Sequence, residues 1–422
     1  MRSWSLRAGD PLGLRFAADA RRGGVDPFRD FVWQLDLAGG DPPALAWRTG
    51  YGQPGREARF FPVLRTETAT GVDPELFVSR PVVRAFHPSF VRVEYEPLPE
   101  IAVTAEFWIP RSDTSAVRMQ LEYRGIEPRL FHLAILSSLR APDPVRPFAA
   151  AQREGVRVLE ATIGGLAPVV FLTGGAGFEP GPYPGLAVDA ELEPGTVRRW
   201  TWVHCAAEDA ARSFQGARDT AAVQWDAEIA RVERIDGGLV EIETGDPAWD
   251  AVLAQSQTGA LRAFVGDIRS LPAPAFVNAR RPDRGHSERG DGRDFDSEWC
   301  SQNAWASWLL AQNVLPSAPE QAKGVVRNLL STQDGQGRID AGPDLAGRRT
   351  GFLCPPLMAN LTWRIYQHTE DLDFLKEVYP RLIDFANSWF DREQDVDGDG
   401  WPEWENWIQA GRRQVPAFVP WH

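Results

Sequence analysis

The 422-residue sequence has little cysteine: Cys205, Cys300 and Cys354 are all that it contains. An odd number of cysteines, none of them in a Cys-x-x-Cys spacing, indicates neither a disulfide framework nor a zinc site built on thiolates. Buried thiols in a reducing compartment are the simpler interpretation, and they favour a cytoplasmic protein.

Long apolar runs and basic clusters are also missing. No run of about 18 apolar residues occurs, which argues against a membrane-spanning helix, and MRSWSLRAGDPLGLRF lacks the apolar segment of a signal peptide. Forty-five Lys and Arg against 58 Asp and Glu give a formal net charge of −13, with no basic stripe. We therefore expect a soluble protein that binds neither nucleic acid nor an anionic membrane and that takes a neutral or cationic ligand.

Tyrosine is scarce, at six residues, whereas tryptophan is abundant, at 17. Flat indoles rest on the apolar C–H faces of sugar rings, and carboxylates or amides between them can hydrogen-bond the hydroxyl groups. The ratio favours a carbohydrate-handling protein. Core packing explains any single tryptophan equally well.

Two patterns of apolar residues divide the chain. From Phe28 to about Cys205, short runs of apolar residues alternate with polar ones and are broken by Gly, Pro and Asp, as expected of a large antiparallel β-sandwich. Residues 208–232 then space their apolar side chains along one helical face and predict a linker helix.

After Gly245 the pattern is that of paired helices. Asp246 and Pro247 form a strong start signal for the first of them. Further helices are predicted at 301–313, 318–333, 355–368 and 372–392. Short turns on one side and long loops on the other suit a toroid of helical hairpins whose loops build a site at one end.

The predicted domains are a β-sandwich at 1–207, a linker helix and connection at 208–244, and the first part of a helical toroid at 245–422. A chain of this length with 43% hydrophobic residues can bury more than one core. Because five helices leave a toroid incomplete and PAFVPWH resembles neither a helix end nor a polar tail, we expect a C-terminally truncated part of a longer protein.

An acidic stretch near the end predicts a metal site. Aspartates alternate and then meet a glycine, which suits calcium because several oxygens must converge within roughly 2.5 Å of the ion while the backbone turns sharply. The twelfth position of an EF-hand loop is an asparagine here, so an acid closer by would have to close the loop. A solvated Asp/Gly-rich turn is the alternative, although three like charges this close favour a neutralising cation. The predicted calcium ligands are Asp395, Asp397, Asp399, Trp401 and Glu403, and no organic cofactor is expected.

Three segments carry a resemblance to a known family. They are LPSAPEQAKGVVRNLLSTQDGQGRIDAGP, CPPLMANLTWRIYQHTEDLDFLKEVYPRLIDFANSWF and DVDGDGWPEW. In this order they resemble the six-hairpin glycosidases, specifically the mannosylglycerate hydrolase and bacterial α-glucosidase members of glycoside hydrolase family sixty-three, which are amylo-alpha-1,6-glucosidase-like. The resemblance implies a multidomain β + α fold, with an antiparallel β-sandwich followed by an incomplete (α/α)6 toroid. It also implies an inverting mechanism with a general acid and a water-activating base, and calcium at the acidic loop of some members.

The sequence departs from this family at the catalytic acid. Family members carry the acid in an E-S-G-x-D-N-S-P element, and the counterpart here is QAGRRQVP, residues 409–416, with Arg413 in the place of the acid. Arginine stays charged at neutral pH and cannot protonate a leaving group. The general base is expected beyond His422.

Two carboxylates are candidates for the missing chemistry. Glu405 would be a displaced acid, because neighbouring indoles would desolvate it and raise its pKa; an acid near the calcium or at the surface is the alternative. Asp296 and Ser297 correspond to an Asp-Ser pair that touches the sugar in the family, and a solvated connection is the alternative. The predicted catalytic residues are Glu405 and Asp296, and the predicted substrate-binding residues are Glu298, Trp299, Trp404, Trp407 and Gln409.

These observations predict a glycoside hydrolase that acts on α-linked glucosides or mannosides, or on glycosylated small molecules. Its expected partner is a saccharide or glycoside. Two alternatives stay open: a catalytically inactive relative that binds saccharide, for which Arg413 argues, and a purely structural protein.

Overall fold

The computed structural model describes residues 14–142, 145–404 and 409. They divide into two compact units, which we treat separately. The first unit contains the described residues up to 237 together with 242–258 and 280–286, and the second contains 238–241, 259–279 and the described residues from 287 onward. Within the described ranges, no helix combines the length and the apolarity that crossing a bilayer requires.

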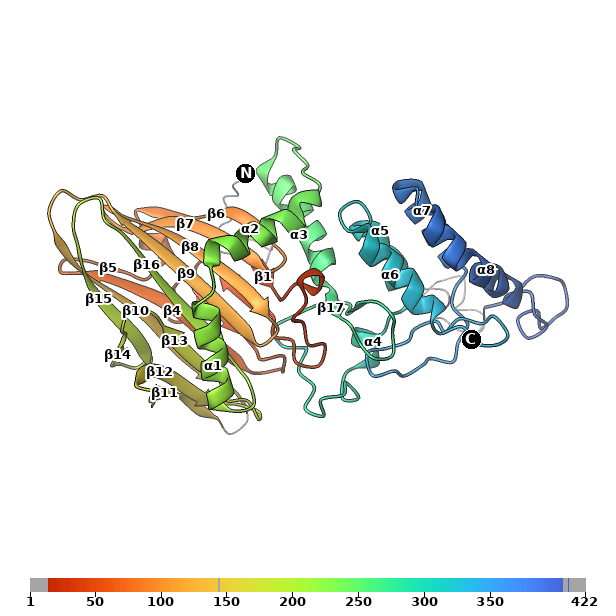
Figure 1. Ribbon diagram of the computed structural model, residues 1–422, viewed down its shortest axis with the longest axis horizontal. Coiled ribbons are helices and arrows are strands. Elements are labelled where there is room, and N and C mark those ends of the chain that lie inside the picture. The colour runs from red at the N-terminus through yellow and green to blue at the C-terminus, as the bar shows by residue number, and fades with distance from the viewer. Residues whose placement is uncertain (1–13, 143–144, 405–408, 410–422) are drawn as a thin grey trace. The chain divides into compact units, whose positions relative to one another are not determined.

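The first unit is built on two antiparallel eight-stranded sheets (Figure 1). The first sheet has the order β1-β2-β3-β4-β10-β15-β14, with β5 paired to β4, and the second has the order β11-β12-β13-β16-β9-β8-β7-β6. The strands of the first sheet are β1 (Leu14–Phe16), β2 (Trp33–Asp36), β3 (Ala46–Thr49), β4 (Glu57–Thr66), β5 (Thr70–Gly71), β10 (Arg129–Arg140), β14 (Gly177–Glu179) and β15 (Gly185–Leu192). Those of the second are β6 (Ser79–His87), β7 (Phe90–Leu98), β8 (Ile101–Arg111), β9 (Thr114–Tyr123), β11 (Arg146–Arg153), β12 (Val156–Thr162), β13 (Val169–Leu172) and β16 (Val197–Cys205).

Buried and exposed side chains alternate along the strands, so each sheet has one apolar face, and these two faces pack together. In β7, Val91, Val93 and Tyr95 are buried while Arg92 and Glu94 between them are partly exposed. The buried side chains of both sheets join in one apolar core. Each large apolar side chain that this core removes from water stabilises the fold by roughly 1.5–3 kcal/mol. Two antiparallel sheets that share one core confirm the predicted β-sandwich.

The predicted linker helix is two helices in the structure. α1 (Ala210–Ala221) and α2 (Trp225–Ile235) are separated by three residues, and both pack on the second sheet. Trp225 is buried, and its Nε1–H donates to Oε2 of Glu106 on β8 at 2.8 Å. The apolar stripe that suggested one helix leading away from the sandwich therefore covers the sheet as an outer layer. Short 3-10 turns complete the unit at η1 (Ala20–Arg22), η2 (Pro74–Leu76) and η3 (Asp236–Gly238), the last of which ends in the second unit.

The second unit is formed mainly by helical hairpins. α5 (Ala304–Val314) and α6 (Pro319–Leu330) form one hairpin, and α7 (Met358–Thr369) and α8 (Leu372–Ser388) form the other. Before them come α3 (Pro247–Arg262), whose residues belong to both units, the paired strands β17 (Phe264–Gly266) and β18 (Ala275–Phe276), and the short α4 (Ser297–Cys300). The four predicted hairpin helices are confirmed, with ends displaced by up to four residues.

Side-chain caps set several of these helix ends. The Oδ1 atom of Asp246 accepts the N–H of Ala248 at 2.8 Å, as the predicted start of α3 requires. Asn303 accepts the N–H of Trp305 at 3.0 Å, so α5 starts at Ala304 and not at the predicted residue 301. Gln302 lies just before this cap and bonds both backbone groups of Phe276, which keeps residues 301 and 302 out of the helix.

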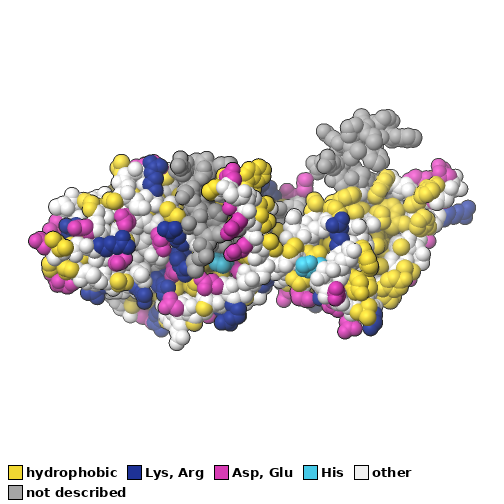
Figure 2. All heavy atoms as spheres, turned by 90° about the horizontal axis from the view of Figure 1, so that it is seen from above, with side chains coloured by type: hydrophobic (Ala, Val, Ile, Leu, Met, Phe, Trp, Pro, Cys, Tyr) yellow, Lys and Arg dark blue, Asp and Glu magenta, His cyan; other side chains and the backbone are white. Residues whose placement is uncertain are grey.

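Apolar side chains of α7 and α8 lie on both sides of these helices. Leu361 and Phe385 are buried, whereas Trp363 is 53% and Tyr379 57% exposed. Figure 2 shows apolar side chains gathered on the surface of this part of the chain. Both helices are nevertheless amphipathic, because polar residues such as Arg364 and Lys376 share the exposed side with these aromatic rings.

Candidate functional site

The long connections of the second unit meet at one end of its hairpins, which we call the loop end. Turns of four and two residues join the helices of each hairpin at the opposite end, where Lys323 near the start of α6 pairs with Asp371 before α8 at 2.6 Å. At the loop end, Arg381 of α8 donates to the carbonyl of Leu330 at 2.6 Å. The connections before α5, between α6 and α7, and after α8 therefore all belong to the loop end. Every described residue that the sequence predicts for the site lies on these connections.

The connection before α5 carries Asp296, Glu298 and Trp299. Asp296 caps α4, because its Oδ1 accepts the N–H of Glu298 at 2.9 Å, and both carboxylates are exposed. Trp299 is 7% exposed, its Nε1–H donates to the carbonyl of Ala279 at 2.8 Å, and its ring meets Phe295 edge to face. Two acids are thus accessible to a ligand here, whereas the indole packs inside; the predicted roles of all three stay predictions.

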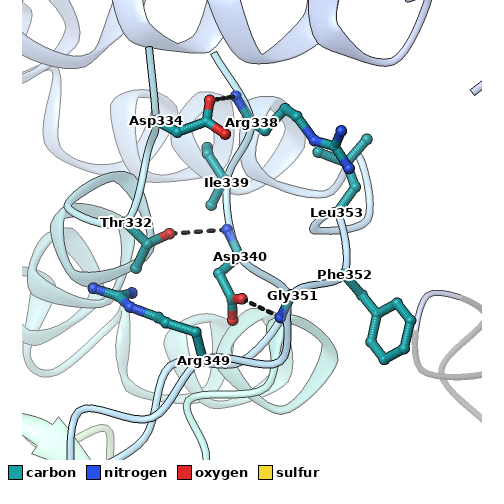
Figure 3. Close-up of a pocket in the computed structure, with 9 residues that line it drawn as sticks. All are labelled: Thr332, Asp334, Arg338, Ile339, Asp340, Arg349, Gly351, Phe352 and Leu353. Atoms are coloured by element: carbon teal, nitrogen blue, oxygen red, sulfur yellow. Dashed lines mark hydrogen bonds between the residues drawn. The ribbon is translucent and has the colours of Figure 1, made fainter. Parts of the chain in front are cut away.

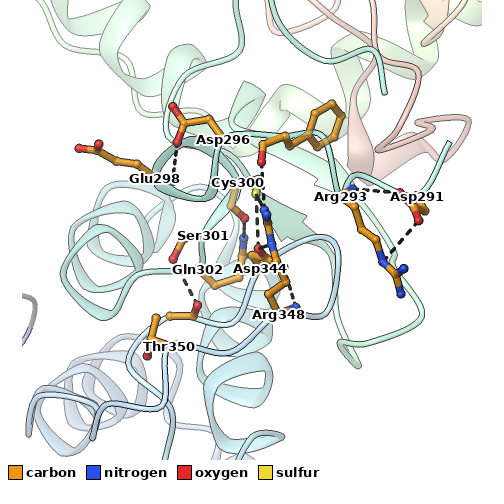
Figure 4. A network of polar contacts seen from close by, with 12 residues as sticks. Asp291, Arg293, Asp296, Glu298, Cys300, Ser301, Gln302, Asp344, Arg348 and Thr350 are labelled. Carbon is orange, nitrogen blue, oxygen red and sulfur yellow. Dashed lines mark hydrogen bonds and ion pairs between the residues drawn. The ribbon is translucent and has the colours of Figure 1, made fainter. Parts of the chain in front are cut away.

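A buried polar group holds α4 against the connection between α6 and α7 (Figure 4). Asp344 is 2% exposed and pairs with Arg348, whose Nη2 also donates to the carbonyl of Phe295 at 3.0 Å and to the sulfur of Cys300 at 3.6 Å. Burial and the charge of Asp344 raise the pKa of Cys300 to about 11, so the thiol stays neutral at pH 7. Figure 4 shows Asp296 and Glu298 pointing away from this group, which therefore positions the segment and leaves its acids accessible.

A cavity of about 250 Å³ lies within the connection between α6 and α7 (Figure 3). Its walls come from the turn after α6 and from the segment that leads into α7. The lining residues are Thr332, Asp334, Arg338, Ile339, Asp340, Arg349, Gly351, Phe352 and Leu353. The two walls pair as short antiparallel stretches, since the N–H of Ala341 donates to Phe352 at 2.9 Å and that of Cys354 to Ile339 at 2.7 Å.

Asp340 ties the two walls of this cavity together. Its Oδ1 accepts the N–H of Thr350 at 3.2 Å and the hydroxyl of the same residue at 3.1 Å, and its Oδ2 accepts the N–H of Gly351 at 2.8 Å. Its own N–H donates to Oγ1 of Thr332 at 2.9 Å. A carboxylate with this many donors is a structural anchor, and it fixes the backbone on which Arg349 and Phe352 stand.

The acidic loop after α8 brings together four of the predicted metal ligands. One oxygen from each of Asp395, Asp397, Asp399 and Glu403 lies within 4.8 Å of the others. In each carboxylate one oxygen accepts a backbone N–H from within the loop, at 2.8 to 3.1 Å. The Oδ1 of Asp395 is buried and has no hydrogen-bond partner in the described part of the chain.

The same loop carries the predicted aromatic lining. Trp401 is 74% exposed, and Trp404 is 43% exposed and meets the buried Trp389 edge to face at 5.5 Å. Trp401, also predicted as a metal ligand, could offer calcium only its backbone carbonyl. Glu405, Trp407 and Arg413 lie outside the described residues.

Gln409 connects the end of the described chain to the cavity wall. Its side chain is buried, and its Nε2 donates to the carbonyl of Leu353 at 3.2 Å. Its own carbonyl accepts Nε1–H of Trp305 on α5 at 2.9 Å. Gln409 therefore joins the segment after α8 to the connection between α6 and α7 and to α5, and its predicted contact with substrate stays a prediction.

Sequence reasoning missed the cavity between α6 and α7. Asp340, Arg349 and Phe352 stand in RIDAGPDLAGRRTGF, which has the polar and glycine-rich composition of an ordinary loop. Two indications were available, the family-like segment that ends in RIDAGP and the position of the loop between two recognisable helices. They predicted the place of the loop at the loop end and not the pairing of its walls.

Residues 300–421 match the family model of the mannosylglycerate hydrolase MGH1-like glycoside hydrolase domain. The match confirms the resemblance to six-hairpin glycosidases for this part of the chain. A search of the curated proteins found no match.

Similar solved structures include a bacterial glucoamylase complexed with acarbose, at 10% identity and a TM-score of 0.49, covering 92% of this chain and 60% of that one. A protein from the human microbiome that is assigned as a kojibiose phosphorylase follows at 8% identity and a TM-score of 0.38, covering 90% of this chain and 53% of that one. The chain thus spans less than two thirds of the length of either structure.

Proposed function

We propose that the protein is a glycoside hydrolase that acts on α-linked glucosides or mannosides, or on glycosylated small molecules, by an inverting acid and base mechanism. The observation that carries the proposal is the glycoside hydrolase family match over residues 300–421, which contain the cavity and the acidic loop. Exposed carboxylates, exposed indoles and a small polar cavity are the groups that a saccharide site requires.

The proposed roles follow from the family mechanism and, for Asp296, from its exposure. An inverting hydrolase needs one carboxylic acid to protonate the leaving oxygen and one carboxylate to activate water, about 6.5–9.5 Å apart. Glu405 is the proposed acid. Asp296 is proposed to contact the sugar next to the scissile bond, because its side chain is exposed, and the water-activating carboxylate is not assigned to a described residue.

The alternative is a relative that binds saccharide without cleaving it. Arg413 favours it, since the family places an acid at that position. In addition, one oxygen of Asp296 already caps α4, which limits its freedom to move toward a substrate.

Hydrolysis of a panel of aryl α-glucosides and α-mannosides by the full-length protein separates the two. A hydrolase should lose turnover in Glu405→Gln and in Asp296→Asn. Asp291→Asn is the matched control, because Asp291 is also exposed and accepts the N–H two residues later, from Arg293 at 3.0 Å. Binding without turnover by the full-length protein would support the non-catalytic alternative, and the absence of both would leave the structural role.

A calcium ion at the acidic loop is a second proposal. Ligands at about 2.3–2.6 Å from a calcium ion lie at most about 5 Å apart, and the carboxylate oxygens here meet that limit at 4.8 Å. Within the described part of the chain, the buried Oδ1 of Asp395 has no hydrogen-bond partner and is the oxygen best placed for a cation. Asp395, Asp397, Asp399 and Glu403 would supply the ligand oxygens, and the bound ion would hold the segment that carries Trp401 and Trp404.

A further inference from the structure

We propose that the cavity between α6 and α7 is a subsite for one sugar ring, in which Arg349 binds two neighbouring hydroxyl groups. This inference rests on the proposed function and adds to it a specificity-determining residue. Arg349 lies on none of the segments that predicted the site from sequence.

Arg349 is available to a ligand. Its side chain is exposed and lines the cavity, and within the described ranges it makes no hydrogen bond or ion pair. The other arginine of the cavity, Arg338, pairs with Glu393. A guanidinium presents its donors in a planar fork that can bond two adjacent oxygens at once, and no internal ion pair has to break before Arg349 does so.

The backbone that carries Arg349 is held before a ligand arrives. Asp340 accepts hydrogen bonds from the two residues that follow Arg349, and the next residue, Phe352, pairs with Ala341 across the cavity. Binding therefore orders one side chain and leaves the loop unchanged, which lowers the entropic cost of association.

The size and charge of the cavity select the class of ligand. A volume of about 250 Å³ is below the roughly 300–1,000 Å³ of pockets that enclose a drug-sized ligand, so it suits one ring of a larger glycoside. The carboxylates of Asp334 and Asp340 oppose a phosphate or carboxylate ligand, whereas a hydroxyl group can donate to one acid and accept from Arg349. Phe352, which is partly exposed, adds an apolar part to the lining of the cavity.

Protection of Arg349 from phenylglyoxal, followed by mass spectrometry of peptides from the full chain, tests this placement. Methyl α-glucoside or methyl α-mannoside should slow modification at Arg349 several-fold. Arg364, exposed on α7, is the reference and should react at the same rate with and without sugar. Protection by inorganic phosphate and not by either sugar would overturn the hydroxyl subsite in favour of an anion site.

Titration of the same glycosides into variants gives the second measurement. Arg349→Gln should weaken binding about tenfold, since hydrogen bonds from a charged donor are lost. Arg349→Lys should recover only part of this, because it keeps the charge and loses the fork, and the control Arg364→Gln should bind like the unchanged chain. If the unchanged chain and Arg349→Gln bind a sugar equally well, the subsite is elsewhere and the proposed function stands. If the unchanged chain binds no sugar at all, the proposed function fails together with the subsite.

Discussion

The two units use the same residue type, tryptophan, for opposite purposes. In the sandwich Trp33, Trp47 and Trp202 are at most 2% exposed and pack against one another and their neighbours. At the loop end of the helical unit Trp401 and Trp404 are 74% and 43% exposed. An unusual tryptophan content therefore does not by itself indicate a saccharide site: part of it builds an ordinary apolar core, and only the exposed part is available to a ligand.

The same contrast holds for charged groups. Asp30 and Arg280, both in the first unit, form an ion pair with side chains 3% and 1% exposed. Asp30 also accepts the hydroxyl of Ser112 at 3.0 Å, and Arg280 donates to the carbonyl of Ala18 at 2.8 Å. In the acidic loop of the second unit, by contrast, the four clustered carboxylates accept backbone N–H groups, and the buried Oδ1 of Asp395 has no partner among the described residues. The buried charges of Asp30 and Arg280 thus neutralise each other, whereas the acidic loop gathers charges of one sign.

The largest expected effect is on the buried pair of the sandwich. Asp30→Ala should lower the free energy of unfolding by about 3–5 kcal/mol, because it leaves the Arg280 guanidinium buried without its charge partner. Urea unfolding followed by tryptophan fluorescence measures this loss. Arg84→Ala is the control, since Arg84 and Glu94 form a pair that is more than 40% exposed on both sides and should contribute at most about 1 kcal/mol. Equal losses in the two variants would contradict the contrast between buried and exposed charges.

Acid should destabilise the sandwich through His204. This residue is fully buried, its Nε2 hydrogen-bonds Oη of Tyr51 at 2.9 Å, and burial lowers the pKa of the imidazole to about 3. Because the folded pKa lies below the unfolded value of about 6.5, the stabilisation is complete above pH 6.5 and is lost as pH falls from there toward 3. At about 1.4 kcal/mol per pH unit, roughly 2–3 kcal/mol should be lost by pH 4.5.

Denaturant midpoints at several pH values test this assignment. His204→Gln removes the titrating group, so its midpoint should fall less steeply with pH than that of the unchanged chain. An identical pH dependence in the two proteins would mean that other groups cause the acid sensitivity of the sandwich.

Chelation should affect the second unit alone. If calcium bridges the carboxylates of the acidic loop, removing it should lower the melting temperature by a few degrees, because each kcal/mol corresponds to about 2–4 °C for a domain of this size. Asp397→Asn should show the lower melting temperature even with calcium present. Asp373→Asn, which changes an aspartate 97% exposed on α8, should melt like the unchanged chain and respond to chelator. A melting temperature that does not respond to chelator would remove the calcium proposal.

The fold was largely predictable because the patterns that specify its strands and helices lie within short stretches of the sequence. Alternation of apolar side chains in strands such as β7 specifies which face is buried, and caps such as Asp246 mark helix starts. The break between α1 and α2 was not predictable, because the apolar stripe continues across it and only packing on the sheet shows where the chain turns.

The arrangement of the candidate site was predictable only where its residues lie close together in the sequence. The convergence of Asp395, Asp397 and Asp399 follows from alternate positions in one turn. The cavity around Arg349 depends instead on Asp340 reaching across to Thr350 and Gly351, ten and eleven residues later, and no period of the sequence records that contact. For Trp299 the sequence neighbours suggested a ligand contact. The indole instead packs against Phe295, which the sequence did not indicate.

The smallest expected effect on stability is also the sharpest test of the two uses of tryptophan. Trp401→Ala should change the free energy of unfolding by less than about 0.5 kcal/mol, because the side chain is 74% exposed. If the indole stacks on a sugar, the same change should weaken binding of a methyl glycoside roughly twofold to tenfold. Trp249→Ala is the matched control, an exposed indole of the first unit at 62%, and should leave both quantities unchanged. Unaltered sugar binding in Trp401→Ala would mean that exposure at the loop end does not mark a ligand contact, and the tryptophan content would then say nothing about function.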